Sequence, residues 1–191
     1  MSTTTASAEA PSAVAPAPGE LEFVRLFVNS RDVEAGTDRF RDQATWTAWT
    51  AGHGLDAAAD PDEIAFARDL REALREALLA NHDHGALPQR AARLLTDAAR
   101  RAEAEVSFDT AGLNLTTGSH GFAAVLGRLI TAAAAAMGDG TWARLKVCRN
   151  DACQWAFYDR SRSRTGQWCS MAICGNRAKQ SRWREQRQGR G

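Results

Sequence analysis

Four cysteines close to the C-terminal end set the strongest constraint on how this chain folds. Cys148, Cys153, Cys169 and Cys174 fall within the last 44 of 191 residues and form two C-x4-C pairs separated by fifteen residues. Two close pairs joined by a short spacer are typical of a tetrahedral zinc site, because each tight turn supplies two thiolates. The spacing therefore predicts one structural Zn²⁺ held by four cysteines, with no coordination position left for water or substrate.

Other roles for four cysteines have to be weighed against zinc. Disulfides are rare in the reducing cytosol, and residues 1–20 have neither the charged nor the apolar region of a secretory signal. A redox pair normally has C-x-x-C spacing, which neither pair shows. Four thiolates can also hold an iron–sulfur cluster. Zinc is the preferred interpretation, and metal binding on the order of 10–16 kcal/mol would supply much of the folding free energy of so small a segment.

The residues between and after the cysteine pairs predict a compact fold around the metal. Residues 154–159 alternate like a strand, and residues 166–169 could form the return strand. Ser170 is a candidate N-cap for a helix whose first turn holds Cys174. A knuckle, a hairpin and a helix that starts at the second cysteine pair together predict a treble-clef arrangement.

Charge is distributed unevenly along the chain. Residues 1–143 contain 12 Arg and Lys against 20 Asp and Glu, a net charge of −8, whereas residues 144–191 contain 12 against 3, a net charge of +9. Such asymmetry indicates a polyanionic partner for the basic segment, although a solvated terminal helix is the alternative. Guanidinium groups without acidic neighbours suit phosphate contacts. The candidate nucleic-acid contacts are Arg160, Arg162, Arg164, Arg177, Lys179, Arg182, Arg184 and Arg187.

The acidic segment is predicted to be mainly helical. Asp60 and Glu63 form a capping box around Pro61, which suits the first helical position, and apolar residues then keep helical spacing to Leu78. Further helices are expected at 40–51, from Pro88 onward, and from a cap at Ser119 to residue 138. The apolar run at 21–30 could be helix or strand.

A short hairpin, a tail and a break complete the predicted organisation. Residues 106–108 and 113–116 resemble the two strands of a hairpin, and residues 1–19, rich in Ala, Pro, Ser and Thr, predict a disordered tail. Gly138-Asp139-Gly140 marks a natural break. The predicted fold is mainly α (α+β). A helical domain at 20–140 with a small β hairpin is followed, at 141–191, by a treble-clef-like four-cysteine zinc finger with a basic C-terminal helix.

Residues 148–179 strongly resemble the CGNR zinc finger. The match runs through Trp155, Phe157-Tyr158-Asp159, Ser161 and Trp168 to the namesake Cys174-Gly175-Asn176-Arg177 and Lys179. Such fingers usually follow an ABATE domain, which is regarded as a bacterial stress-induced transcription regulator, and Phe27-Val28-Asn29-Ser30 resembles the Phe-Val-Asn-Thr signature of that domain. The resemblance implies zinc ligation by the four cysteines and nucleic-acid binding by the basic segment.

Several side chains allow two interpretations. Arg177 is expected either to touch phosphate or to lock the hairpin through Asp159, and Trp183 either to pack against the hairpin or to stack on a base. Trp46 and Trp49 could line an effector pocket, but residues of this type are more often core. His82 and His84 look like a metal clip, yet a position at a helix end favours a structural role.

These features together predict a regulator and not an enzyme. No phosphate-binding loop, dinucleotide fingerprint or recognisable catalytic group appears in the sequence. We expect a cytoplasmic transcription regulator that binds double-stranded DNA through the finger, while the helical domain senses a small-molecule effector or forms a homodimer. RNA binding and a protein-interaction role for the finger are the alternatives. No apolar run approaches the roughly 18–20 residues needed to span a bilayer, so no membrane association is expected.

Overall fold

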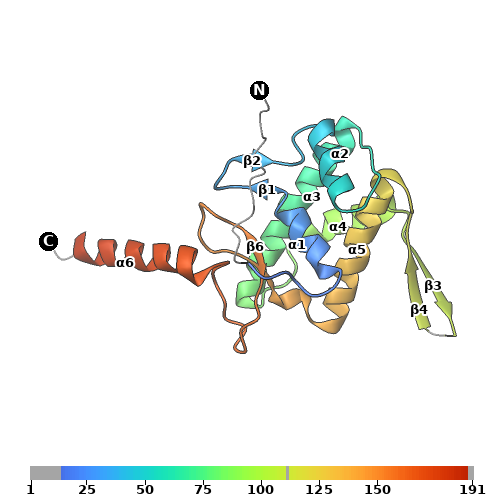
Figure 1. Ribbon diagram of the computed structural model, residues 1–191. Coiled ribbons are helices and arrows are strands. Elements are labelled where there is room, and N and C mark those ends of the chain that lie inside the picture. The colour runs from blue at the N-terminus through green and yellow to red at the C-terminus, as the bar shows by residue number, and fades with distance from the viewer. Residues whose placement is uncertain (1–13, 111, 189–191) are drawn as a thin grey trace, which may run out of the picture.

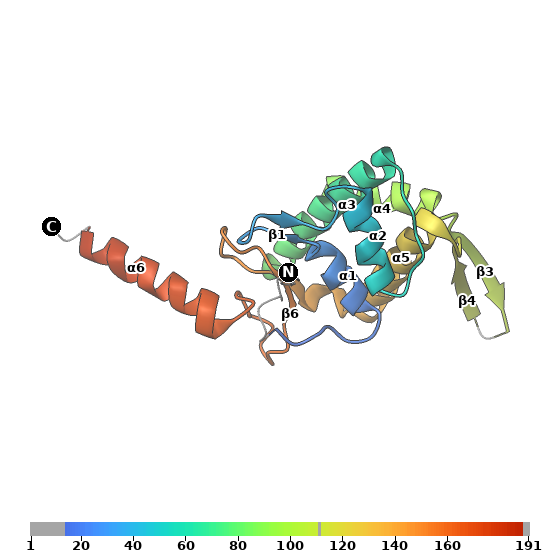
Figure 2. The same cartoon turned by 45° about the horizontal axis from the view of Figure 1, so that its top comes forward.

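A helical body carries two projecting elements, as the computed structural model shows for residues 14–110 and 112–188 (Figure 1). The β3–β4 hairpin extends from one side of this body, and helix α6 extends from the side that holds the metal-binding loops; the turned view in Figure 2 shows the same separation. The mainly α (α+β) architecture predicted from the sequence is confirmed. The helices are α1 (Leu21–Val28), α2 (Gln43–Gly52), α3 (Pro61–Ala80), α4 (Gln89–Arg101), α5 (Gly121–Asp139) and α6 (Asn176–Gln188).

Three short helical turns and three antiparallel strand pairs connect these helices. The turns are η1 (Asn81–Asp83), η2 (Trp142–Arg144) and η3 (Met171–Gly175). The strand pairs are β1 (Arg31–Asp32) with β2 (Thr37–Asp38), β3 (Glu105–Asp109) with β4 (Gly112–Thr116), and β5 (Leu145–Val147) with β6 (Ala156–Tyr158).

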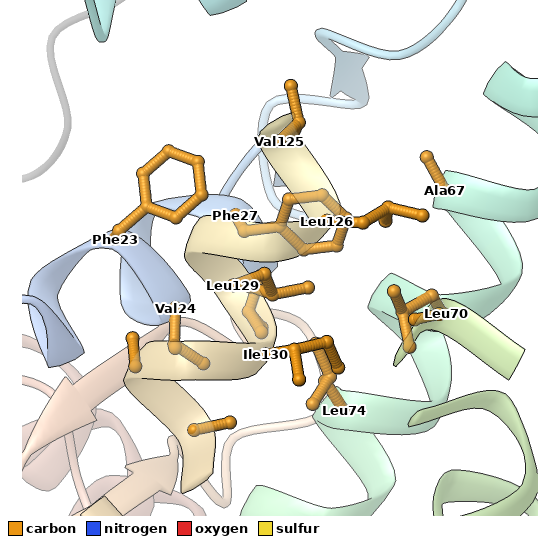
Figure 3. Packing of buried hydrophobic residues seen from close by; sticks show 14 of the residues in the cluster. Phe23, Val24, Phe27, Ala67, Leu70, Leu74, Val125, Leu126, Leu129 and Ile130 are labelled. Atoms are coloured by element: carbon orange, nitrogen blue, oxygen red, sulfur yellow. The ribbon is translucent and has the colours of Figure 1, made fainter. Parts of the chain in front are cut away.

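The centre of the core lies between α1, α3 and α5 (Figure 3). These helices place an apolar stripe of buried residues toward one another, which is how an amphipathic helix is stabilised in a globular protein. The side chains that meet there are Phe23, Val24 and Phe27 from α1, Ala67, Leu70 and Leu74 from α3, and Val125, Leu126, Leu129 and Ile130 from α5.

The start of α3 confirms the predicted capping box. The Asp60 carboxylate accepts hydrogen bonds from the backbone N–H groups of Asp62 and Glu63 at 2.9 and 2.8 Å, and Glu63 accepts one from the Asp60 N–H at 2.9 Å. Pro61 occupies the first turn, where its missing N–H costs no helical hydrogen bond. Backbone N–H groups at this end of the helix, which have no partner within the helix, thus donate to the side chains that the sequence indicated.

Other helix starts differ in detail from the sequence-based expectation. The apolar run at 21–30 is resolved as helix α1, and α2 begins after an Asp42 cap. The prediction that Ser119 caps the following helix was wrong: α5 begins at Gly121, its N-cap is His120, and the Ser119 hydroxyl lies 2.7 Å from the His120 ring instead. Gly121 has a φ of +59°, a backbone conformation that favours glycine and allows the sharp entry into the helix.

The β3–β4 hairpin confirms the predicted strands and is largely exposed. Its register pairs Val106 with Leu115 and Phe108 with Leu113, so these four side chains share one face. Phe108 is 77% exposed, and Val106 and Leu113 are also exposed. The hairpin therefore holds an apolar face outside the core.

Helix α5 is long enough and apolar enough to cross a membrane by length and composition alone, a candidate that the sequence-based expectation missed. It nevertheless contains Arg128, and half of its apolar window is buried inside the protein. Core helices of soluble proteins pass the same test, and α5 packs against α1 and α4 with its apolar side chains in the core.

Only part of the predicted tail falls within the described residues. Residues 1–13 lie outside them, whereas residues 14–19 are described: Ala17 is buried, and its N–H donates to Glu22 at 2.6 Å. Val14 packs against the cysteine cluster. This stretch therefore joins the helical body to the metal-binding segment.

Candidate metal centre

The first cysteine pair lies at the end of the β5–β6 hairpin. Leu145 pairs with Tyr158 and Val147 with Ala156, and the Cys148 N–H donates to the Trp155 carbonyl at 2.9 Å. The predicted return strand at 166–169 was wrong, because the true partner of 156–158 precedes the first cysteine. Residues 145–147 form a strand of only three residues that is buried throughout, Lys146 included, and so short a run carries no clear strand signal.

Asn150 organises the turn between Cys148 and Cys153. Its carbonyl accepts the N–H groups of Cys153 and Gln154 at 2.8 and 3.0 Å, and its side-chain oxygen accepts the Ala152 N–H at 3.2 Å. The Asn150 side-chain amide also lies 3.6 Å from the Cys174 sulfur. Donors aimed at cysteine sulfur orient metal ligands and stabilise their thiolate form.

The second cysteine pair lies at the entry to the terminal helix. The turn η3 begins after Ser170, as predicted, and runs directly into α6, although the Ser170 side chain makes no capping bond. A Cβ atom on Gly175 would lie only 2.9 Å from the Met171 sulfur and 3.3 Å from the Trp168 ring. The Met171 side chain is exposed and can move aside, so the tight contact with the Trp168 ring is the firmer limit on side-chain size directly after Cys174.

The four sulfur atoms lie within 4.8 Å of one another and can hold one metal ion. The sulfur of Cys169 is 3.6 Å from that of Cys153 and 3.8 Å from that of Cys174. Four sulfurs placed about 2.3 Å from a tetrahedral centre would be about 3.8 Å apart. The observed separations fit this arrangement and are too long for disulfides, whose sulfurs are about 2.05 Å apart.

Crowding of the sulfurs separates the pKa values of the thiols. Hydrogen bonds from the Cys153 and Cys169 thiols lower the pKa of Cys148 to about 2. The Cys153 thiol donates a hydrogen bond to the Cys148 thiolate, and this bond raises the pKa of Cys153 to about 12. Hydrogen bonds with the same two cysteines raise the pKa of Cys169 as well. A bound cation would instead stabilise all four thiolates, and this donor set therefore fits a metal centre.

A buried ion pair fixes the loop between the two cysteine pairs. The Lys146 ammonium donates to Asp159 at 2.9 Å and to the Arg164 carbonyl at 2.5 Å, and the side chains of Lys146 and Asp159 are only 1% and 3% exposed. Asp159 also accepts the N–H groups of Ser161 and Gly166 at 2.9 and 2.8 Å. A Cβ on Gly166 would lie 2.8 Å from the Asp159 carboxyl carbon, so a larger residue does not fit here.

The charge network also sets the pKa of Asp159. Burial alone would raise this pKa, but hydrogen bonds from Ser161, Lys146 and Gly166 outweigh the burial and lower it to about 2. The carboxylate is therefore ionised at neutral pH and is fully engaged inside the segment.

Arg177 does not lock the hairpin through Asp159, which was one of the two expectations for it. Its guanidinium instead donates to Glu34 at 2.8 Å, in the turn between β1 and β2, and both side chains are about half exposed. This exposed pair joins the start of α6 to the helical body.

The other candidate nucleic-acid contacts lie in two groups. Arg160, Arg162 and Arg164 are exposed on the loop after β6, where Arg160 also donates to the Pro16 carbonyl at 2.7 Å and lies over the Tyr158 ring. Lys179 and Arg184 are exposed on α6. Arg182 and Arg187 lie on the same helix, but their side chains fall outside the described set.

Trp183 is not buried against the hairpin. It is 58% exposed on α6, which projects away from the helical body (Figure 1). Trp46 and Trp49, in contrast, are buried in an aromatic cluster with Phe27 and Phe40, as the core interpretation predicted, and Trp49 also lines a pocket.

Asn29 docks the metal-binding segment onto the helical body. Its side-chain amide donates to the Ala156 carbonyl at 3.0 Å, and its side-chain oxygen accepts the Ala156 N–H at 2.7 Å. The side chain thus pairs with β6 as a neighbouring strand would. The position was noticed in the sequence as part of a signature, but nothing local indicated this long-range role.

Arg75, Asn81 and His82 were missed as docking residues by sequence reasoning. Arg75 donates to the Gln154 and Val28 carbonyls at 2.6 and 2.8 Å, which bridges the two parts of the chain. Asn81 donates to the carbonyls of Trp142 and Leu145. His82 lies 2.6 Å from the Val147 carbonyl, so its Nε2 donates there and the ring is structural.

A helical body joined to a four-cysteine metal finger with a basic helix defines the class of this protein, and comparison with family models agrees. The model of the CGNR zinc finger matches residues 144–187, and the ABATE model, described as "Putative stress-induced transcription regulator", matches residues 21–140. The second match covers more than half of the chain, so the chain belongs to the ABATE family. The comparison with curated proteins gave no match.

Proposed function

We propose that this protein is a cytoplasmic transcription regulator that binds double-stranded DNA through a zinc-loaded finger. The observation that carries the proposal is the projecting basic helix α6, which follows directly from the fourth cysteine. Its 13 residues include five Arg and Lys and one acid. The described side chains of α6 are mostly polar and exposed, and an α-helix fits the DNA major groove.

The exposed loop after β6 adds a second cationic surface. Of the candidate nucleic-acid-binding residues whose side chains are described, only Arg177 forms an ion pair, and that pair is exposed. Unneutralised guanidinium groups release counterions when they bind phosphate, and this release favours association at low salt. We infer that the loop contacts the DNA backbone while α6 lies in the groove.

Zinc is the metal that we propose for the four cysteines. Four thiolates at tetrahedral spacing leave no open position, so the ion would be structural and would hold the loop and α6 in fixed relation. The helical body would sense a small molecule or form a homodimer, since regulators commonly join such a domain to a DNA-binding one.

Binding of zinc-loaded protein to mixed duplex DNA across a salt series tests this proposal. We expect affinity to fall steeply with salt, by about 0.9 in log–log slope for each phosphate contact, and to vanish after metal chelation. The double variant Lys179→Gln/Arg184→Gln should weaken binding and flatten the slope, whereas Arg100→Gln, an exposed change on α4, should do neither. Absence of binding even at low salt would contradict the DNA proposal.

Trp183 supports one alternative that the same assay resolves. An exposed indole on a basic helix can stack on an unpaired base, as in recognition of single-stranded RNA. Tighter binding to single-stranded RNA than to duplex DNA at matched salt would favour that alternative, with a marked loss in Trp183→Ala.

A further inference from the structure

A hollow lies where the helical body meets the metal-binding segment. It has a volume of about 360 Å³, is open to solvent on one side, and is bordered by α1, the β1–β2 hairpin, α2 and Trp155 from the finger. This volume falls within the range of about 300–1,000 Å³ that is usual for small-molecule sites. Residues from both parts of the chain therefore form a single pocket.

The walls of the pocket suit a flat apolar group. Leu26, Ala48, Trp49 and Trp155 contribute apolar surface, and both indole rings are more than nine-tenths buried. Trp49 also packs against His53, with ring centroids 4.3 Å apart. Aromatic side chains favour stacked or edge-on contact with another ring, so a planar ligand fits these walls.

Two donors at this pocket lack partners in the described part of the chain. The indole N–H of Trp155 is buried and makes no hydrogen bond there, which is rare for a buried polar group. The Arg39 guanidinium, which also lines the pocket, forms no hydrogen bond or ion pair among the described residues.

Two nearby acids make other contacts and form no ion pair with Arg39 among the described residues, and one of them, Asp32, also lines the pocket. Asp38 accepts two hydrogen bonds from Arg71, at 2.6 and 2.7 Å, and Asp32 accepts the Ala35 N–H at 2.9 Å. Arg39 is exposed where it lines the pocket, whereas the Trp155 indole nitrogen is closed off from the surface, so the guanidinium is the group that a carboxylate on the ligand would reach.

We propose that this pocket binds a small planar aromatic carboxylate. The proposal deepens the sensing role given above, because it supplies the site and the ligand class for the helical body of the proposed regulator. The ring would lie against Trp49 and Trp155, and the carboxylate would face Arg39.

Trp155 also connects the pocket with the metal centre. It lies two residues after Cys153 and packs within the cysteine cluster, and its carbonyl accepts the Cys148 N–H. A ligand that packs against this ring holds the backbone that carries two of the four sulfurs. Occupancy of the pocket is therefore expected to slow metal loss from the finger.

Calorimetric titration of the zinc-loaded full-length protein with indole-3-acetate tests the site, with indole-3-acetamide as the neutral analogue. We expect the carboxylate to bind about two- to fivefold more tightly than the amide, because the ion pair with the exposed Arg39 is lost in the amide. Arg39→Gln should remove this preference, and Ala48→Trp, which fills the pocket, should weaken both probes. Arg41→Gln, an exposed change outside this pocket, is the matched control.

Each result supports or overturns one part of the proposal. No binding of either probe at millimolar concentration would overturn the pocket, equal binding of acid and amide would overturn the carboxylate preference, and unchanged binding in a folded Ala48→Trp variant would overturn the location. A rate of zinc transfer to a chelator that is unchanged by saturating probe would overturn the link to the metal. Because none of these measurements contains DNA, their failure is distinct from failure of the DNA-binding proposal.

Discussion

At the scale of single residues, the Lys146–Asp159 pair shows how a small metal-binding segment holds a long loop. Two opposite charges are buried together and are satisfied by further backbone partners. A buried pair contributes little beyond an apolar replacement, but removal of one member leaves the other charge desolvated and unpaired. The pair therefore makes the loop sensitive to a change in either residue.

Asp159→Asn is expected to lower the free energy of unfolding by roughly 3–5 kcal/mol, because Lys146 would remain buried without a counter-charge. The double variant Asp159→Asn/Lys146→Met should recover a large part of this loss. Denaturant unfolding of zinc-loaded protein measures both, with the exposed Asp151→Asn as the control. A double variant no more stable than the single one would show that the charge pair is not the cause.

His82 makes the docking of the finger sensitive to pH. Burial lowers the pKa of His82 below its ordinary value of 6.5, assisted by the charges of Arg149 and Lys146, although the bond to the Val147 carbonyl opposes the shift. The folded protein thus binds a proton less readily than the unfolded chain. The stabilisation from neutral His82 is present above about pH 6.5 and is lost as the pH falls below it.

His82→Gln should remove this dependence while keeping a donor for the Val147 carbonyl. Between pH 7.5 and 5.5, at about 25 °C and saturating zinc, the original protein is expected to lose unfolding free energy relative to the variant. Parallel denaturant titrations at several pH values measure the difference. Identical pH profiles for the two proteins would contradict the assignment.

At the scale of elements, the β3–β4 hairpin contributes little to stability because three of the four apolar side chains on its face are exposed. Phe108→Ala is expected to change the unfolding free energy by less than about 0.5 kcal/mol, since the ring is 77% exposed. Phe27→Ala, the same change at a fully buried site in α1, should cost about 3–5 kcal/mol. A large loss in the Phe108 variant would show that the hairpin is covered in solution.

Elements whose signals lie in a few neighbouring residues could be predicted from the sequence. The capping box at Asp60, the β3–β4 strands and the four metal-binding cysteines all follow from local chemistry at fixed spacing. The position of α5 was nearly correct, although the choice of Ser119 over His120 as its cap failed. Several polar residues there fit a cap equally well before the backbone path is known.

Long-range pairings could not be predicted in this way. The strand at 156–158 was assigned a partner after it, whereas the true partner lies before the first cysteine. The contact of Asn29 with Ala156 could not be predicted either, because it joins residues 127 positions apart in the sequence. Arg39 and Trp155, which carry the pocket proposal, come together only after that docking.

At the scale of the whole molecule, the finger and the helical body share one core. Leu145, Val147 and Ala156 belong to the same buried cluster as the residues of α1, α3 and α5. The body is thus completed by strands that lie beyond the predicted break at residues 138–140. Stability of the metal centre and stability of the helices are therefore coupled.

Metal removal is expected to destabilise the entire protein in one cooperative transition. Chelation, or Cys174→Ser, should lower the thermal midpoint followed by the helical signal and by tryptophan fluorescence to the same extent, since coincident probes report two-state unfolding. The measurement compares the thermal midpoints given by the helical signal and by tryptophan fluorescence, before and after chelation. Helices that stay unaffected by metal loss would show that the body folds without the finger.

The shared core also has a consequence for biosynthesis. α1 and α3 are complete by residue 80, but the strands that cover them end only at residue 158. At translation rates of about 5–20 residues per second, the ribosome needs roughly 4–16 s to make the intervening chain. During this interval the nascent helices present an apolar surface that later residues will bury, and they are suited to capture by chaperones until the finger emerges.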